Sequence, residues 1–202
     1  MTRPNPARRA PRQQPADEPP IDGRRTDTKN RIHDVALAVF SERGWDGATL
    51  REIAERLEIT RPALYYHYRS KEDILASIHR DLARSVDGIL DWARAQPATA
   101  ATRVEILHRL ADLMAGPWGM FIAFAQANEA AMRNLTAAEE FAGRMDSLAD
   151  LLKPSDTVVG RMKARLALDA LFMAGSRRRQ LGGSDTERCQ AALATANSLI
   201  EA

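Results

Sequence analysis

The chain has 202 residues, of which 45% are hydrophobic and 28% charged, as is ordinary for a globular protein. Aromatic residues make up only 5%, and the β-branched and aromatic runs typical of strands are missing, so the composition excludes a β-rich fold and indicates an all-helical protein. A net charge of +2 and a pI of about 8.9 permit nucleic-acid binding, but only the placement of the charges can argue for it.

The first 25 residues hold six of the ten prolines and six arginines, with almost nothing to bury. Residues 1–25 are therefore predicted to form a disordered, basic, Pro-rich arm. Such an arm is either a flexible tail or a segment that follows DNA phosphates or enters a minor groove. Three acidic residues in the arm weaken the second interpretation.

Helical periodicity begins near residues 26–27. One apolar face is formed by Ile32, Val35, Ala36, Val39 and Phe40. This helix is expected to stop at Gly44. Thr49 then caps a second, short helix, with Glu52 completing a capping box. Thr60 caps a third helix, with Pro62 in its first turn, where a missing N–H is tolerated. Two short helices joined by a tight turn and leaning on a first helix indicate a helix–turn–helix domain over residues 26–72.

A longer helix is predicted to start after Ser70, with Asp73 as its box partner, and to reach about Arg94. Further helices are predicted over about 102–115, 118–133, 136–153, 155–181 and from 184 to the C-terminus, with Gly116-Pro117 and Gly182-Gly183 as breaks. Residues 73–202 are therefore expected to form a second, helical domain.

The stretch ITRPALYYHYRSKEDIL (59–75) contains all three tyrosines of the chain within four positions. Leu64 and Tyr68 are four residues apart and share a face, which is inward for Leu64, so Tyr68 is expected in the core. Tyr65 and Tyr66 are then left outside, beside Arg61. Exposed there, they offer hydroxyls to phosphates and ring faces to bases. The alternative is a packed aromatic corner.

The segment AVFSERGWDGATLREIAERLEITRPALYYHYRSKEDIL resembles the DNA-binding domain of the tetracycline-repressor (TetR) family, and LYYHYRSKEDIL is its most specific part. The resemblance spans about residues 28–75. It implies a bacterial regulator that binds double-stranded operator DNA as a homodimer. By position, it assigns DNA contacts to Thr49, Arg51, Thr60, Arg61, Pro62, Ala63, Tyr65, Tyr66, His67 and Lys71.

The roles implied for these residues differ. Thr49 and Arg51 begin the helix that crosses the DNA backbone, and residues 60–66 belong to the recognition helix. His67 and Lys71 match positions that hold phosphates, although His67 could also be a half-buried structural histidine. The sequence departs from the family pattern at Glu58, where glycine is common. If the turn requires a positive φ there, Glu58 carries a strain of about 1 kcal/mol.

The resemblance implies that residues 73–202 bind a small-molecule effector and dimerise. Large, adaptable side chains gather around the Gly116-Pro117 break, and the candidate ligand-binding residues are Met114, Trp118, Met120, Phe121, Phe124 and Phe172. Aromatic and methionine side chains line apolar pockets. They suit a packed core equally well, so the chemistry of the ligand stays open.

The last two helices are the candidate dimer interface. The longer carries Val158, Met162, Leu166 and Met173, and the final one a face of mostly small residues, Ala192, Thr195, Ala196 and Leu199. Small residues permit close approach, so two helices from each subunit could form a four-helix interface. The alternative is that these helices only close the subunit's own core.

Several other functions lack a signal in the sequence. Cys189 is the single cysteine, which excludes an intramolecular disulfide and fits a reducing compartment. No apolar run reaches the roughly 18 residues of a membrane span, and no signal peptide is apparent, so a cytoplasmic protein is expected. The four histidines show no metal-ligand spacing, and nucleotide-binding and nucleophile motifs are missing. We expect neither an enzyme nor a cofactor.

These patterns together predict a homodimeric transcription regulator, with a repressor that a small molecule releases from a palindromic operator as the main hypothesis. An activator or a ligand-independent co-regulator is an alternative within the same class. A helical protein-interaction module that uses the tyrosine face is an alternative from a different class.

Overall fold

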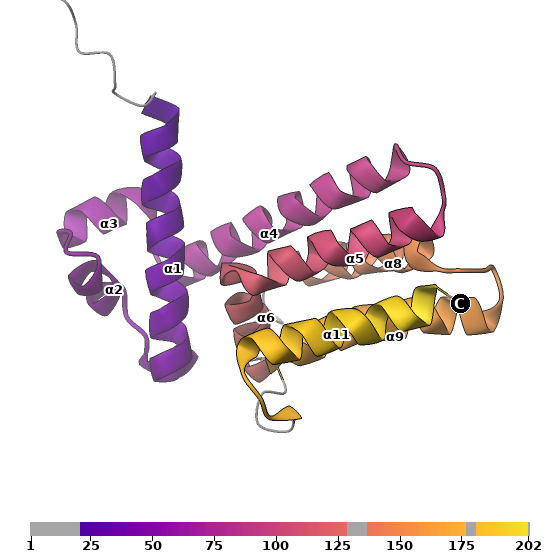
Figure 1. Cartoon of the computed structure of the whole chain (residues 1–202). Helices are drawn as coiled ribbons and strands as arrows, with labels where there is room; N and C mark the ends of the chain where they lie inside the picture. Colours follow the sequence, from indigo (N-terminus) through magenta and orange to yellow (C-terminus); the bar gives the residue numbers. More distant parts are fainter. Residues whose placement is uncertain (1–20, 129–136, 177–180, 202) are drawn as a thin grey trace, which may run out of the picture.

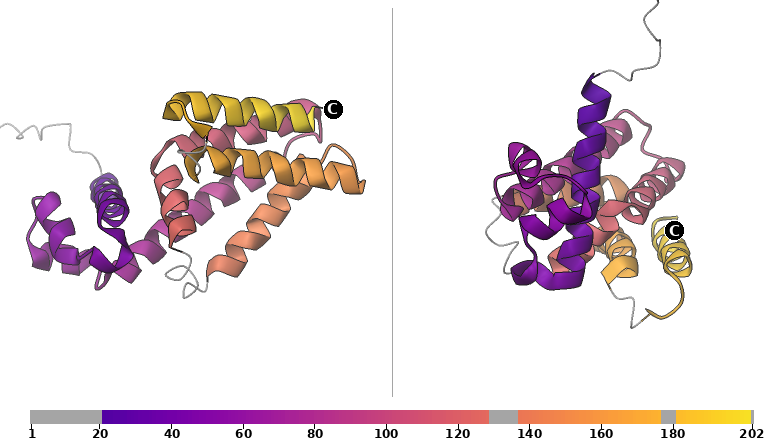
Figure 2. Two further views of the ribbon diagram at one scale, coloured as in Figure 1. Left: turned by 90° about the horizontal axis from the view of Figure 1, so that it is seen from below. Right: turned by 90° about the vertical axis from the view of Figure 1, so that its left-hand side faces the viewer.

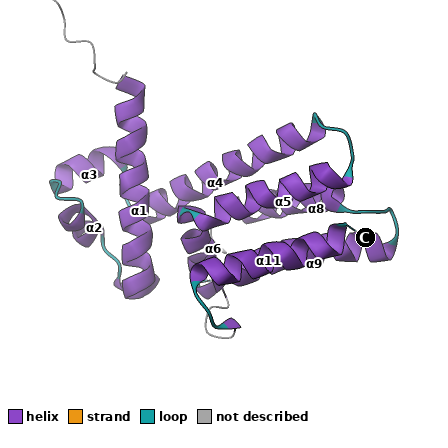
Figure 3. Ribbon diagram, viewed as in Figure 1, coloured by secondary structure: helices purple, strands orange, loops and turns teal. Residues whose placement is uncertain are grey.

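The computed structural model describes residues 21–128, 137–176 and 181–201, and these residues form helices joined by turns and loops (Figures 1 and 3). The N-terminal domain consists of α1 (Ile21–Gly47), α2 (Leu50–Arg56) and α3 (Arg61–His67). The C-terminal domain consists of α5 (Ala100–Ala115), α6 (Pro117–Ala127), α8 (Ala137–Leu152), α9 (Val158–Ser176) and α11 (Asp185–Ile200). Between them, α4 (Lys71–Arg94) begins beside α1 and runs into the C-terminal bundle (Figure 1). The all-helical prediction is confirmed.

The start of α1 corrects one prediction. Residues 21–25, which were expected to belong to the disordered arm, are helical, because Pro20 is the last proline before the helix and nothing after it interrupts the backbone hydrogen bonds. Residues 1–20 lie outside the described part of the chain. At the other end, Gly44 adopts φ 71°, so helical geometry breaks where the sequence indicated. Helix α1 nevertheless continues beyond this kink to Gly47.

Side-chain caps begin the short helices as predicted. Thr49 accepts a hydrogen bond from the Glu52 backbone N–H (3.2 Å), and Thr60 accepts one from Ala63 (3.4 Å). Ser70 caps α4 in the same way, through the Asp73 backbone N–H at 3.1 Å. The box at Thr49 is only half formed, because the Glu52 carboxylate binds Arg43 and Arg56 instead.

In the C-terminal domain, Ser184 and Glu187 form the complete capping box that the sequence predicted for α11. Thr99 caps α5, so this helix begins at Ala100, two residues before the predicted start. Thr157 binds the Gly160 backbone N–H (3.1 Å), and α9 begins at Val158 rather than near 155. Parts of three predicted helices lie outside the described residues. The end of helix 118–133 and the start of helix 136–153 fall in residues 129–136, and the end of helix 155–181 falls in residues 177–180.

Helices α5 and α8 pack along α4, whose apolar stripe from Ile74 to Leu90 is buried. Helices α9 and α11 lie side by side along the outer face of this domain (Figures 1 and 2). The two domains meet where α1 contacts α6. At this junction the ring of Phe124 lies 5.5 Å from Phe40 and 5.9 Å from Trp45, centroid to centroid. We call these three rings the junction cluster.

Candidate DNA-binding surface and ligand cavity

One side of α3 is fixed in the core. Leu64 is completely buried, and Tyr68, which follows the helix as its C-cap, is 8% exposed. The Tyr68 hydroxyl lies 2.9 Å from His33 Nε2 on α1 and donates to Ser77 Oγ on α4 at 3.1 Å. The prediction that Tyr68 belongs to the core is therefore confirmed. Its hydrogen bonds connect the end of α3 to both neighbouring long helices.

The buried network of Tyr68, His33 and Ser77 continues to the charged side chains of Asp81 and Lys29. His33 Nδ1 lies 3.6 Å from Asp81 Oδ2, and Lys29 Nζ donates to the other carboxylate oxygen at 2.7 Å. Burial lowers the pKa of His33 from 6.5 to about 4, against the opposing attraction of Asp81. Burial also raises the pKa of the Tyr68 hydroxyl. Both rings are therefore neutral at pH 7, which suits their low exposure.

The opposite side of α3 faces solvent. Tyr65 is 53% exposed and Tyr66 is 80% exposed, as the sequence predicted. Four further predicted contact residues are exposed on the same helix or at its start: Thr60, Arg61, Pro62 and Ala63. His67 is exposed too, with its ring edge-on to Tyr66 at 5.4 Å, so the interpretation as a half-buried histidine is wrong. The first turn of α3 carries no acidic residue that would repel a phosphate.

The turn before α3 shows the expected strain. Glu58 adopts φ 57°, the left-handed conformation that glycine tolerates best. Its backbone N–H donates to Glu55 O, and the next N–H, of Ile59, donates to Ala54 O. The turn therefore requires the positive φ that the sequence anticipated at this position. A side chain there is accommodated at a cost of about 1 kcal/mol.

Two predicted contact residues are engaged within the domain. Arg51 is exposed, but its Nε donates to Glu55 Oε1 at 2.7 Å. Lys71 donates to the backbone carbonyl of Trp45 at 2.5 Å, and its ammonium lies 4.6 Å from the centre of the Trp45 ring. Both contacts hold Lys71 against the kink of α1. Sequence reasoning had no signal for this pair, because the two residues are 26 positions apart.

Most of the predicted ligand residues belong to the core. Phe121 and Phe124 are 2% and 4% exposed, and Phe124 is part of the junction cluster. Trp118 is half-buried against the core. Phe172 and Met114 line a closed apolar cavity of only about 20 Å³, which is close to the volume of one water molecule. These aromatic side chains therefore pack in the core, and their role as ligand contacts stays a prediction.

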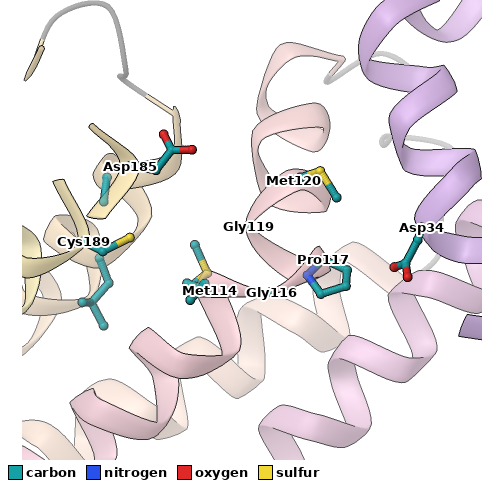
Figure 4. Close-up of a pocket in the computed structure, with 11 residues that line it drawn as sticks. Asp34, Met114, Gly116, Pro117, Gly119, Met120, Asp185 and Cys189 are labelled. Atoms are coloured by element: carbon teal, nitrogen blue, oxygen red, sulfur yellow. The ribbon is translucent and has the colours of Figure 1, made fainter. Parts of the chain in front are cut away.

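A larger cavity of about 510 Å³ lies where α1, the α5–α6 turn, α9 and α11 meet (Figure 4). We call it the junction cavity. Two predicted residues, Met114 and Met120, line it, and the other lining residues are Asp34, Ala115, Gly116, Pro117, Gly119, Leu171, Ala174, Asp185 and Cys189. Sequence reasoning missed Asp34, Asp185 and Cys189, because no periodic pattern connects four separate segments of chain.

The predicted dimer face is exposed along α9 and partly buried along α11. Val158, Met162, Leu166 and Met173 are between 42% and 70% exposed. In contrast, Ala192 and Ala196 are buried at 8% and 0%, because α11 packs these small side chains onto its own subunit. An open groove of about 600 Å³ remains between the two helices, lined by residues that include Leu166, Met173, Thr195 and Leu199.

Comparison with known proteins gives the same assignment for the N-terminal domain. Residues 32–78 match the family described as bacterial regulatory proteins, tetR family. In this domain, the chain is similar to the tetR family. The match is to regulatory proteins, in agreement with the expectation that the chain is not an enzyme. In the described part of the chain, no group of three or more His, Cys, Asp or Glu residues could hold a metal ion, and no helix is long and apolar enough to cross a membrane.

Similarity in sequence is confined to a short region, whereas similarity in fold extends over most of the chain. The biofilm operon icaADBC negative transcriptional regulator IcaR of Staphylococcus epidermidis is 48% identical over 46 residues, which are 23% of this chain and 25% of IcaR. The chain thus spans about a quarter of the length of the curated relatives it matches. The fold of the whole chain is similar to that of PfmR from Thermus thermophilus, with a TM-score of 0.68, 18% identity and coverage of 85% and 97% of the two chains.

FadR from Bacillus subtilis, solved in complex with stearoyl-CoA, shares the fold with a TM-score of 0.59 and 15% identity. The matched parts cover 85% of this chain and 98% of FadR. The C-terminal domain is therefore similar to solved structures in its fold, whereas the N-terminal domain is similar to known regulators in sequence as well.

Proposed function

We propose that this chain is a DNA-binding transcription regulator, a repressor that reads a palindromic operator through the outer face of α3 and is released by a small-molecule ligand. The observation that carries the proposal is the exposure of Tyr65 and Tyr66, at 53% and 80%, beside Arg61. The chain is similar to IcaR in this domain, and IcaR is a negative regulator, which supports repression rather than activation.

The chemistry of this surface suits DNA. A recognition helix enters the major groove, where tyrosine rings contact thymine methyl groups and hydroxyls reach phosphates. Arg61 offers a guanidinium to guanine or phosphate. The capped start of α3 and the buried Leu64 and Tyr68 fix the helix that carries these side chains.

A homodimer would present two such helices. The exposed apolar residues of α9 and the groove along α11 supply a surface for a four-helix interface. Substituting Leu166 by Glu should convert dimer to monomer in sedimentation analysis, because Leu166 lines the groove. The matched control Gln190→Glu, on the exposed side of α11, should remain dimeric. A monomeric parent would contradict the interface.

The mechanism of release would be a population shift. Helix α4 belongs to both domains, so a ligand that favours one arrangement of the C-terminal domain also selects the spacing of the two recognition helices. Operator half-sites for such a dimer lie about 34–36 Å apart, one turn of DNA, so a small change in spacing prevents simultaneous contact.

The first test is a selection of bound sequences from a randomised duplex pool, with the parent beside the Tyr65→Ala/Tyr66→Ala variant. We expect the parent to enrich a palindrome, and each substitution to weaken binding by about 1–3 kcal/mol. Binding by the parent should also weaken steeply with salt, as phosphate contacts require. If the parent enriches no sequence, or the folded variant retains the same palindrome equally well, the tyrosine face does not read DNA.

A regulator without ligand control is a second candidate, favoured by the 20 Å³ volume of the cavity inside the C-terminal bundle. A drug-sized effector does not fit in that cavity, whereas the junction cavity is large enough for one. An operator affinity that no bound ligand changes would favour this second candidate.

A further inference from the structure

The junction cavity lies between the two domains rather than inside the C-terminal bundle. Figure 4 shows Asp34 of α1 on one side, the α5–α6 turn with Met114, Pro117 and Met120 in the middle, and Asp185 of α11 on the other side. Its volume of about 510 Å³ falls within the range of small-molecule sites. A molecule bound here would touch the helix that supports the DNA-binding domain directly.

The wall between the two ends is apolar and adaptable. It consists mainly of Met114, Met120, Pro117 and Leu171, and thioether side chains adjust to irregular hydrophobic ligands. Gly119 fixes the shape of this wall, because a Cβ there would lie 2.2 Å from the carbonyl oxygen of Met114. The first turn of α6 is therefore held tightly on the end of α5.

Among the described residues, the charged side chains that line the cavity are both acidic. Asp34 is exposed and has no ion-pair partner among the described residues, and partial desolvation raises the pKa of its carboxylate. Asp185, at the other end, is already paired with Arg188. None of the described residues that line the cavity is basic. A positive group on a ligand would supply the missing partner for Asp34.

We propose that the junction cavity is the effector site and that its ligand is a hydrophobic monovalent cation, with the charge at Asp34 and the apolar body against the methionine wall. This inference rests on the proposed function, of which it specifies the ligand. The route to DNA follows from the geometry. Helix α6 carries Met120 in the cavity and Phe124 in the junction cluster, so a ligand between α6 and Asp34 changes how the domains are held together.

The test uses two probes of nearly equal shape and opposite charge, tetraphenylphosphonium and tetraphenylborate, titrated calorimetrically into the full-length protein. We expect the phosphonium to bind the parent more tightly than the borate. Asp34→Asn should weaken phosphonium binding by about two- to fivefold, the range of a partly exposed ion pair. The matched control Asp46→Asn, another exposed acid on α1 that does not line the cavity, should leave binding unchanged.

A second variant tests the location independently of charge. Ala115 lines the cavity and is exposed, so Ala115→Trp should fill the space without disturbing the core and should abolish phosphonium binding. The inference is overturned if the parent does not bind the phosphonium, if both probes bind equally, or if Asp34→Asn matches the control.

Failure of this site and failure of the proposed function are distinguishable. A selected palindrome with no phosphonium binding overturns the site and leaves the regulator intact. Phosphonium binding that depends on Asp34, in a protein that enriches no duplex, supports the site and overturns the function. If both stand, saturating phosphonium should lower the affinity for the selected duplex, and Asp34→Asn should restore it at the same phosphonium concentration.

Discussion

Helices α3 and α6 begin alike and differ in what they bury. Both have a proline in the first turn, and both carry large aromatic residues, two on α3 and three on α6. On α3, only Leu64 is buried and Tyr65 and Tyr66 face solvent, whereas on α6 Phe121 and Phe124 are almost completely buried. A helix that is apolar nearly all round is held inside, whereas one with a single apolar anchor presents its other sides. Aromatic residues therefore indicate a binding surface on α3 and a core on α6.

The sharpest test of this contrast compares one aromatic residue from each helix. Phe121→Ala should lower the free energy of unfolding by about 3–5 kcal/mol, because a buried ring leaves a cavity. Tyr66→Ala should change it by no more than about 0.5 kcal/mol, as for an exposed side chain. Urea denaturation gives both values. A large loss for Tyr66→Ala would show that its ring is packed, and the contrast would fail.

The buried side of the α3 region should respond to pH. The pKa of His33 is about 4 in the fold and near 6.5 when unfolded, so the unfolded chain binds the proton more readily. The contribution of neutral His33 to the free energy of unfolding is fully present above pH 6.5. It is lost as the pH falls towards 4, by roughly 2 kcal/mol after allowance for partial solvent access.

Urea unfolding of the parent and of His33→Asn at about pH 7 and about pH 4.5, on either side of the ordinary histidine pKa, measures this effect. The variant should lose less stability between the two pH values than the parent, whatever its stability at neutral pH. Equal losses would mean that His33 titrates normally in the fold, and therefore that the network with Tyr68 does not exclude its charged form.

The two tyrosine environments of the α3 region are compared by removing single hydroxyls. Tyr68→Phe should destabilise the protein by about 1–2 kcal/mol, because His33 and Ser77 lose their buried partner. Tyr65→Phe removes an exposed hydroxyl and should leave the melting temperature unchanged while weakening DNA binding. Thermal unfolding followed by circular dichroism distinguishes them, and equal melting temperatures for both variants would contradict the assignment of Tyr68 to the core.

The smallest predicted change in stability concerns the turn that precedes α3. Glu58→Gly should stabilise the protein by about 1 kcal/mol, because glycine adopts φ 57° without strain. The matched change Glu55→Gly lies inside α2 and should destabilise it by a similar amount. A destabilised Glu58→Gly variant would mean that the turn carries little strain.

Much of the N-terminal domain could be predicted because its determinants are local. Thr49, Thr60 and Ser70 were recognised as caps from the residues that follow them, and each caps the backbone N–H three positions on. The outward direction of Tyr65 and Tyr66 follows from their helical offset to Leu64. Glu58 was singled out because the family that the sequence resembles often has glycine at this position. The caps and the outward tyrosines needed only a few consecutive residues, because capping and helical periodicity act over that range.

Other features required contacts between distant segments. The burial of Ala192 and Ala196 depends on how α11 packs, and the contact of Lys71 depends on a carbonyl in the kink of α1. The junction cavity depends on α1, the α5–α6 turn, α9 and α11 meeting at one place. The sequence by itself determined where helices begin and which side of α3 is free, since those follow from neighbouring residues. Only the tertiary structure decided which aromatic residues of the C-terminal domain are core and where a ligand has room, because packing joins side chains that no periodic pattern relates.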